Sequence, residues 1–345
     1  MTVYKIDPLT DPRWADLQQR HAQASLFHTQ AWLEALKRTY GYEPVAYTTS
    51  APESDLKNGV VFCDIKTWPT GRRLVSLPFS DHCRPLVSSS EESTHILNSL
   101  RAQFAHEHWR HIEVRCAGID MDPATGFEPG ATYYLHTLDL RPTLDELYSR
   151  FHKDSVRRKI HRAERESLKY EQGNSESLLS KFYDLLLLTR RRHKIPPQPI
   201  QWFRNLIACL GEAVTIRVAF KDARPIASIL TLRHKRTLIY KYGCSDQKFS
   251  NLGGTQLLFW KAIQDAKNSQ LDELDMGRSD IDNAGLVTFK DRWGATRSAL
   301  PYWRYPGLSE GFRRSWAARA VAEMLVHMPD RIVTSAGKLL YRYVG

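Results

Sequence analysis

The sequence contains few cysteines, and they follow no pattern that would join them. Its 345 residues include five Cys, and the chain has no C-x-x-C pair. An odd number of scattered thiols argues against a disulfide framework and against a structural zinc site. We therefore expect a reduced, cytosolic protein without a bound metal.

Long apolar runs and two familiar catalytic signatures are also missing. The first residues, MTVYKIDPLTDPRW, lack the apolar stretch of a signal peptide, and no run elsewhere is long enough to span a membrane. The segment HEHWRH at 106–111 is not the metalloprotease signature H-E-x-x-H, because Arg110 stands where the second His belongs. The hydrolase motif G-x-S-x-G is absent as well.

Positive charge, in contrast, is abundant. Lys and Arg number 49 against 38 Asp and Glu, which gives a formal net charge of +11. Such a surplus favours polyanionic partners, namely nucleic acid, the phosphates of CoA or an anionic membrane. The hydrophobic content of 42% supports a packed core, and the length suggests about two domains.

One order of predicted elements occurs twice. Three strands, a polar loop, a helix and a further strand are expected at 44–116 and again at 214–276. The two segments are not alike in sequence. The pattern predicts two similar α/β units packed side by side, and chance recurrence in a mixed α/β chain is the alternative.

Two stretches of the second half could meet phosphate groups. A predicted strand ends at Tyr242-Gly243, and Gly253-Gly254 opens a helix whose free N–H groups and dipole favour an anion. A structural turn explains the Gly pair equally well. The basic helix expected at 152–172 carries Arg157 and Arg158, and it fits either a solvated face or a phosphate-bearing partner.

Two further segments carry candidate functional residues. Asp275 follows an apolar strand, and Lys290 lies on a short predicted helix, either near a cleft or on the surface beside Asp291. Residues 309–345 have apolar residues at helical spacing and basic residues on the other faces. This tail is expected to dock either on the protein itself or on an anionic membrane.

Several of these stretches resemble the FemAB-like family of acyl- and aminoacyltransferases. The similar segments are SLFHTQAWLEALKRTYGYEP, SVRRKIHRAERESLKYE and GGTQLLFWKAIQDAKNSQLDELDMGRSDIDNAGLVTFKDRWGA. The C-terminal HMPDRIVTSAGKLLYRYVG is similar to relatives associated with exopolysaccharide and exosortase gene sets. Ser88 departs from the family pattern, because the peptidoglycan enzymes carry a substrate-side Asp there.

The resemblance implies an α/β (α+β) fold with two tandem GNAT-like (N-acetyltransferase) domains, each with a mixed central sheet. They would span 1–141 and 142–308, followed by the amphipathic helical tail at 309–345. It also implies N-acyl transfer from acyl-CoA or aminoacyl-tRNA to an amine, on a cell-envelope, peptidoglycan or exopolysaccharide precursor. The protein would then act in the cytoplasm, or at the inner face of the plasma membrane through its tail.

The same resemblance assigns the site. Lys290, in the family's Phe-Lys pair, would stabilise the charge of the transition state, with Asp275 and Tyr242 as further catalytic candidates. Residues expected to bind the donor are Gly243, Cys244, Gly253, Gly254, Thr255, Arg157 and Arg158. The alternative from another class is a non-catalytic GNAT-like scaffold protein that binds the membrane surface.

Overall fold

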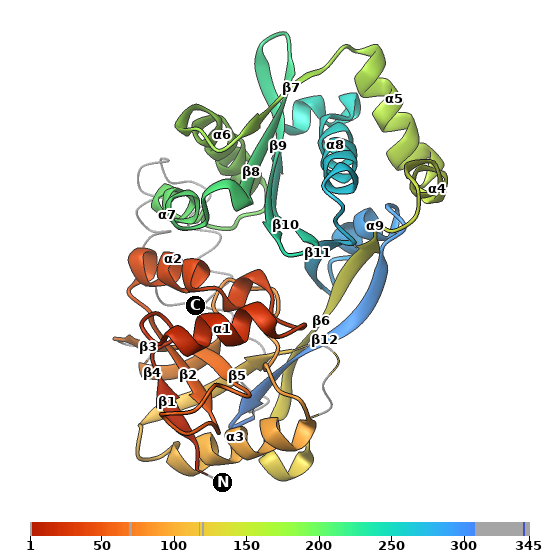
Figure 1. The fold of residues 1–345 in the computed structure, drawn as a ribbon. Coiled ribbons are helices and arrows are strands. Elements are labelled where there is room, and N and C mark those ends of the chain that lie inside the picture. Colours follow the sequence, from red (N-terminus) through yellow and green to blue (C-terminus); the bar gives the residue numbers. More distant parts are fainter. Residues whose placement is uncertain (1, 69–70, 117, 119–120, 308–340, 342–345) are drawn as a thin grey trace. The chain divides into compact units, whose positions relative to one another are not determined.

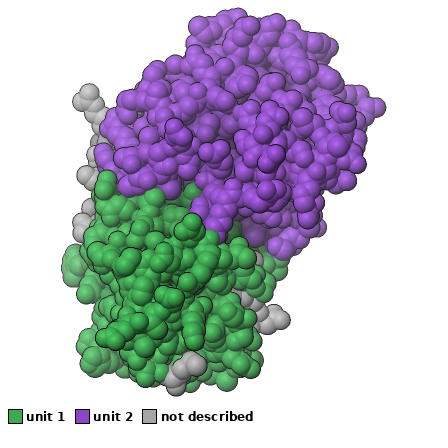
Figure 2. All heavy atoms as spheres, in the orientation of Figure 1, with its two compact units in different colours: residues 1–133, 299–315, 339–345 green, residues 134–298, 316–338 purple. Residues whose placement is uncertain are grey.

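The computed structural model describes residues 2–68, 71–116, 118, 121–307 and 341, and it has a mixed α/β fold (Figure 1). The α/β class expected from the sequence is thereby confirmed. The chain divides into two compact units (Figure 2). The predicted amphipathic tail lies outside the described residues except for position 341, and the predicted domains 1–141 and 142–308 stay a prediction.

The first unit comprises residues 1–133, 299–315 and 339–345. Its helices are α1 (Pro12–Arg20), α2 (Gln30–Tyr40) and α3 (Ser90–Gln103), with short 3-10 turns η1 (Leu26–His28) and η2 (Pro123–Thr125). Its strands are β1 (Tyr4–Ile6), β2 (Glu43–Thr48), β3 (Val60–Thr67), β4 (Gly71–Ser76) and β5 (Trp109–Arg115). Helix α2 starts at an N-cap residue, because the Thr29 hydroxyl accepts from the Trp32 N–H at 3.2 Å.

The second unit comprises residues 134–298 and 316–338. Its helices are α4 (Leu144–Arg150), the π-helical turn η3 (Lys153–Arg157), α5 (Arg158–Arg165), α6 (Glu176–Arg192), α7 (Ile200–Leu210), η4 (Gly211–Ala213), η5 (Gln247–Leu252), α8 (Gly254–Asn268) and α9 (Ala284–Asp291). Its strands are β7 (Lys169–Gly173), β8 (Val214–Lys221), β9 (Arg224–His234), β10 (Thr237–Ser245) and β11 (Glu273–Asp280). Strands β6 (Glu128–Asp139) and β12 (Thr296–Tyr305) have residues in both units.

The strands of the described residues form one mixed sheet of 12, in the order β1-β2-β3-β4-β5-β12-β6-β11-β10-β9-β8-β7. The repeated pattern predicted from the sequence is confirmed as a repeat of topology. In the first unit β2, β3 and β4 are antiparallel, and β4 pairs in parallel with β5 after helix α3. In the second unit β8, β9 and β10 are antiparallel, and β10 pairs in parallel with β11 after helix α8.

The single basic helix expected at 152–172 is wrong in its second half. Helix α5 ends at Arg165, and Ser167 takes a positive φ of 51° that no helix continues. Residues 169–173 then pair with β8 as the strand β7. The pairing overrides the helical spacing, because an open strand edge of the sheet offers this segment a full ladder of hydrogen bonds.

Aromatic packing in the second unit fixes the short helix α9. Trp293, just after α9, stacks on Phe259 of α8 with ring centroids 5.2 Å apart, and Phe151 meets its ring edge-on at 5.0 Å. All three side chains are fully buried. Such contacts add to the burial energy of the rings and hold α9 against α8. In the part of the chain that the structure describes, no helix is long and apolar enough to cross a membrane.

Candidate functional site

The neighbouring strands β10 and β11 separate partway along their length. Their parallel register runs from Thr237 and Glu273 only as far as Ile239 and Asp275. Both strands continue further, β10 to Ser245 and β11 to Asp280. The main-chain groups that would have joined them therefore border an opening in the sheet at the carboxyl ends of both strands.

A β-bulge in β10 lies at the start of this opening. Opposite β9, Tyr240 pairs with Thr231 and Tyr242 pairs with the next residue, Leu230, so that Lys241 is the extra residue. Bulges bend a strand and re-aim its main chain. Beyond the bulge, every second residue of β10 directs its N–H away from β9 and toward the opening. Such N–H groups suit a developing oxyanion.

Gly243 follows the bulge, and its lack of a side chain is necessary. A Cβ at this position would meet the hydroxyl oxygen of Tyr240 at 2.0 Å. The Tyr240 ring packs on Phe259, with centroids 4.6 Å apart, and burial raises the pKa of its hydroxyl. Tyr240 therefore stays neutral and occupies the space above Gly243.

The side chains of Tyr242 and Cys244 face the packed interior on the α6 and α7 side. The Tyr242 hydroxyl accepts from the Trp202 indole N–H at 2.8 Å, and its ring lies 5.1 Å from that of Phe203. The Cys244 thiol donates to the Phe182 carbonyl at 3.5 Å, and burial raises its pKa. A thiol held protonated is a poor nucleophile. Neither side chain therefore lines the opening.

Helix α8 begins next to the opening without a side-chain cap. Its N-cap, Gly253, has a φ of +82°, and no side chain hydrogen-bonds to the cap position. A Cβ on Gly253 would meet the main-chain oxygen of Lys159 at 2.1 Å, so that α5 passes directly against this turn. Gly254 packs on β9, where a Cβ would meet Ala227 and Ile226 at 3.2 Å, and Thr255 lies half-buried in the first turn. An uncapped helix start of this kind attracts anions.

The predicted basic residues lie beside this helix start. Lys159 donates from Nζ to the carbonyl of Asn251 at 3.0 Å, which ties α5 to the loop before α8. Arg157 is half-buried in η3, and the exposed Arg158 pairs with Asp154 at 3.0 Å. The structure therefore places a basic segment near the uncapped end of α8, and the pairing of Arg158 reduces its free charge.

Lys290 is buried beneath the end of β11. Its side chain is 2% exposed, and Nζ donates to the carbonyls of Gly277 and Arg278 at 2.8 Å each. Asp275, 3% exposed, accepts from the Gly277 N–H at 2.7 Å. Asp275 and Lys290 thus hydrogen-bond to the same main-chain segment, Gly277 and Arg278, in the part of β11 that no longer pairs with β10. A buried ammonium is tolerated because it is hydrogen-bonded.

One residue that the sequence did not indicate, His136, interacts with Lys290. The imidazole of His136, on β6, is fully buried, with Nδ1 3.4 Å from the Ser279 hydroxyl and Nε2 3.4 Å from a carboxylate oxygen of Asp291. Burial, with the positive charge of Lys290, lowers the pKa of His136. The ring is therefore neutral at pH 7. His136 lies more than a hundred residues from Ser279 and Asp291, so neither spacing nor a motif could have connected it to them.

The arrangement of antiparallel strands, parallel splayed pair and intervening helix defines a class. Residues 150–291 match the family model described as acetyltransferase (GNAT) domain. The match covers the basic segment, β10, α8 and Lys290. No curated protein matches this sequence.

Solved structures extend the likeness to nearly the whole chain. The structure of FemX has a TM-score of 0.68 at 15% identity, covering 90% of this chain and 98% of that one. A tandem GNAT protein from the clavulanic acid biosynthesis pathway has a TM-score of 0.56 at 11% identity, covering 90% and 100%. The C-terminal domain of a putative lysylphosphatidylglycerol synthetase from Agrobacterium fabrum has 0.55 at 13%, covering 91% and 94%. The shared property is the fold.

Proposed function

We propose that the protein is an N-acyltransferase whose donor carbonyl enters the opening between β10 and β11. The observation that carries this proposal is the separation of the two strands beyond Ile239 and Asp275, next to the uncapped start of α8. Phosphates of the donor would lie against the N–H groups of Gly253, Gly254 and Thr255. The GNAT-domain match over 150–291 supports the same reading.

The chemistry follows from the parts that border the opening. A neutral acceptor amine attacks the donor carbonyl, a C–N bond forms, and the oxyanion is stabilised by the β10 N–H of Gly243, which points away from β9. The C–S bond of a thioester or the C–O bond of an aminoacyl ester then breaks, and the amine proton passes to the leaving group. Lys290 contributes positive charge from below the end of β11, and Asp275 fixes the turn that Lys290 holds.

The donor is acyl-CoA or aminoacyl-tRNA, and the acceptor is an amine on an envelope or exopolysaccharide precursor. The basic segment with Arg157 and Arg158 favours the tRNA, and the glycines at the start of α8 favour CoA. Among the similar folds are FemX and a domain of a putative lysylphosphatidylglycerol synthetase. Cytoplasmic action at the membrane face, through 309–345, is part of the same proposal.

Thr255→Glu tests the donor site. A carboxylate in the first turn of α8 suits the helix dipole, so the fold should be kept, but it repels a bound phosphate. Isothermal titration with acetyl-CoA and with aminoacyl-tRNA should show at least tenfold weaker binding of the true donor. Gln264→Glu, which adds the same charge farther along α8, should bind within twofold of the wild type. If the wild type bound neither donor, the proposal would be wrong.

A further inference from the structure

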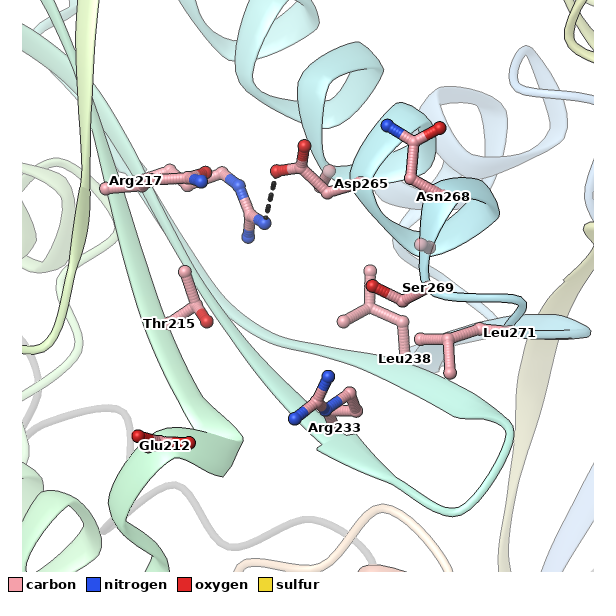
Figure 3. A pocket seen from close by; sticks show the side chains of 12 residues that line it. Glu212, Thr215, Arg217, Arg233, Leu238, Asp265, Asn268, Ser269 and Leu271 are labelled. Atoms are coloured by element: carbon pink, nitrogen blue, oxygen red, sulfur yellow. Dashed lines mark hydrogen bonds and ion pairs between the residues drawn. The ribbon is translucent and has the colours of Figure 1, made fainter.

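A cavity of about 370 Å³ lies in the second unit (Figure 3). It is lined by the C-terminal end of α8, including Asn268 and Ser269, and by Leu238 in the paired part of β10. Helix α8 has 15 residues, which at 1.5 Å each separates its two ends by roughly 20 Å. A molecule in this cavity would therefore not occupy the donor site.

The sheet alternation brings the polar residues of this cavity to one face. Thr215 and Arg217 are two residues apart on β8, and Arg217 is opposite Gln172 of β7. Arg233 of β9 is opposite Leu238 of β10. Residues opposite each other in a ladder, or two apart on one strand, share a face. All five line the cavity beneath the end of α8.

Arg217 is the buried charge of this cavity. It is 5% exposed, and it donates to Asp265 of α8 at 2.8 Å (Figure 3). It also donates to the Thr231 hydroxyl at 2.9 Å. Its Nε is buried and has no hydrogen-bond partner in the described part of the chain. Arg217 is thus held in the wall of the cavity by Asp265 and Thr231.

The remaining two charges of the lining are opposite in sign. Arg233 on β9 and Glu212 on η4 are both exposed, and neither has an ion-pair partner among the residues that the structure describes. Because Asp265 is already paired with Arg217, the cavity offers one uncommitted cation and one uncommitted anion. A ligand with a single charge would pair with only one of Arg233 and Glu212, and the other side chain would remain without an opposite charge.

We propose that this cavity binds a small zwitterion, a molecule that carries both a carboxylate and an ammonium group. The carboxylate accepts from Arg233, and the ammonium donates to Glu212. Asn268 and Ser269 supply hydrogen bonds at the mouth. The volume equals roughly twelve waters at about 30 Å³ each, enough for an amino acid or a dipeptide. The inference is independent of the acyl-transfer proposal.

A series of linear amino acids measures the separation of the two charges. Isothermal titration is carried out on the full chain with glycine, 4-aminobutyrate and 6-aminohexanoate, and with butyrate and butylamine as singly charged controls. One member of the series should bind at least tenfold more tightly than either control. If the singly charged compounds bound equally well, or if no amino acid bound at millimolar concentration, the proposal would be overturned.

Variants at the rim locate the binding. Arg233→Gln and Glu212→Gln should each weaken the best amino acid about tenfold, and both positions are exposed, so the fold should not suffer. Arg165→Gln removes the same charge from an exposed position of α5 outside the cavity and should bind like the wild type. Unchanged affinity in both rim variants would place the amino acid elsewhere and refute the site.

Discussion

At the scale of single residues, Lys290 is the side chain best placed for a catalytic role. Few lysines are as buried as this one, at 2% exposure, unless they are paired. Its ammonium holds two successive carbonyls of β11 at 2.8 Å. The same contacts serve two purposes, because they fix the turn beside the opening and bring positive charge to it.

Lys290→Met separates these two purposes. The variant loses two charge-assisted hydrogen bonds, so the free energy of unfolding should fall by about 2–3 kcal/mol, measured by urea denaturation. Turnover, measured below the unfolding transition, should fall far more than donor affinity, because the charge acts on the transition state. Lys153→Met, at an exposed position of η3, should change neither quantity.

Two outcomes would contradict this assignment. Normal turnover in Lys290→Met would remove Lys290 from the chemistry. An equal loss of turnover and donor affinity would mean that Lys290 only shapes the opening, since a misplaced β11 disturbs binding as much as reaction.

The sequence indicated Lys290 and Asp275 because they lie in one continuous stretch that resembles a known motif. It could not indicate His136, whose partners Ser279 and Asp291 are more than a hundred residues away. Nor could it show that the side chains of Tyr242 and Cys244 form hydrogen bonds with Trp202 and Phe182. Side-chain direction depends on which elements cover each face of the sheet, and a single sequence does not contain that information.

At the scale of elements, the junction between α5 and α8 is the most constrained part of the candidate site. Gly253 combines a left-handed φ of +82° with the main-chain oxygen of Lys159 in the place of a Cβ. The glycine pair predicted to open a helix does open one, and the reason lies partly in packing that the sequence could not reveal.

Gly253→Ala should be strongly destabilising. The positive φ alone costs an alanine about 1–2 kcal/mol, and a Cβ 2.1 Å from a main-chain oxygen forces α5 or α8 to shift, so a total of about 3–4 kcal/mol is expected. Urea denaturation with an unchanged dependence on denaturant measures the difference.

Gly294→Ala is the matched control for this change. Gly294 has a similar φ of +75° in the same unit, but its nearest neighbour would be the Arg150 Cβ at 3.6 Å, an ordinary contact. It should lose only about 1–2 kcal/mol. Equal losses in the two variants would show that the contact with Lys159 does not constrain the junction.

Element order was more predictable than element ends. The repeated three strands, helix and strand could be read from hydrophobic periodicity, since each buried strand or helix face has its own spacing. The strand β7 was not predicted, because its residues are mostly polar and exposed, and only the open edge of β8 explains it.

At the scale of the whole molecule, the strand β6 decides where the second half begins. Its last residues belong to the second unit, which starts at 134. Leu138 and Leu140 join the core around Phe259 with 3% and 0% exposure, and the Leu140 N–H donates to the Asp272 carbonyl at 2.7 Å. A boundary at 141/142, although it coincides with a break in the sequence at Pro142, removes these residues from that core.

We therefore predict different behaviour for two fragments of the second half. Residues 134–298 should unfold cooperatively in urea, whereas residues 142–298 should not. The shorter fragment lacks the neighbour strand of β11 and two buried leucines, each worth about 1.5–3 kcal/mol. That loss is a large part of the 5–15 kcal/mol by which a domain is usually stable.

Leu138→Ala in the fragment 134–298 is the reference for this comparison, because it keeps the strand β6 and removes one buried side chain. It should reduce the free energy of unfolding by about 2–4 kcal/mol without abolishing the cooperative transition. If 142–298 unfolded as cooperatively as 134–298, the second half would be independent of β6. The opening between β10 and β11 would then form without residues 134–141, which include His136, the neighbour of Lys290.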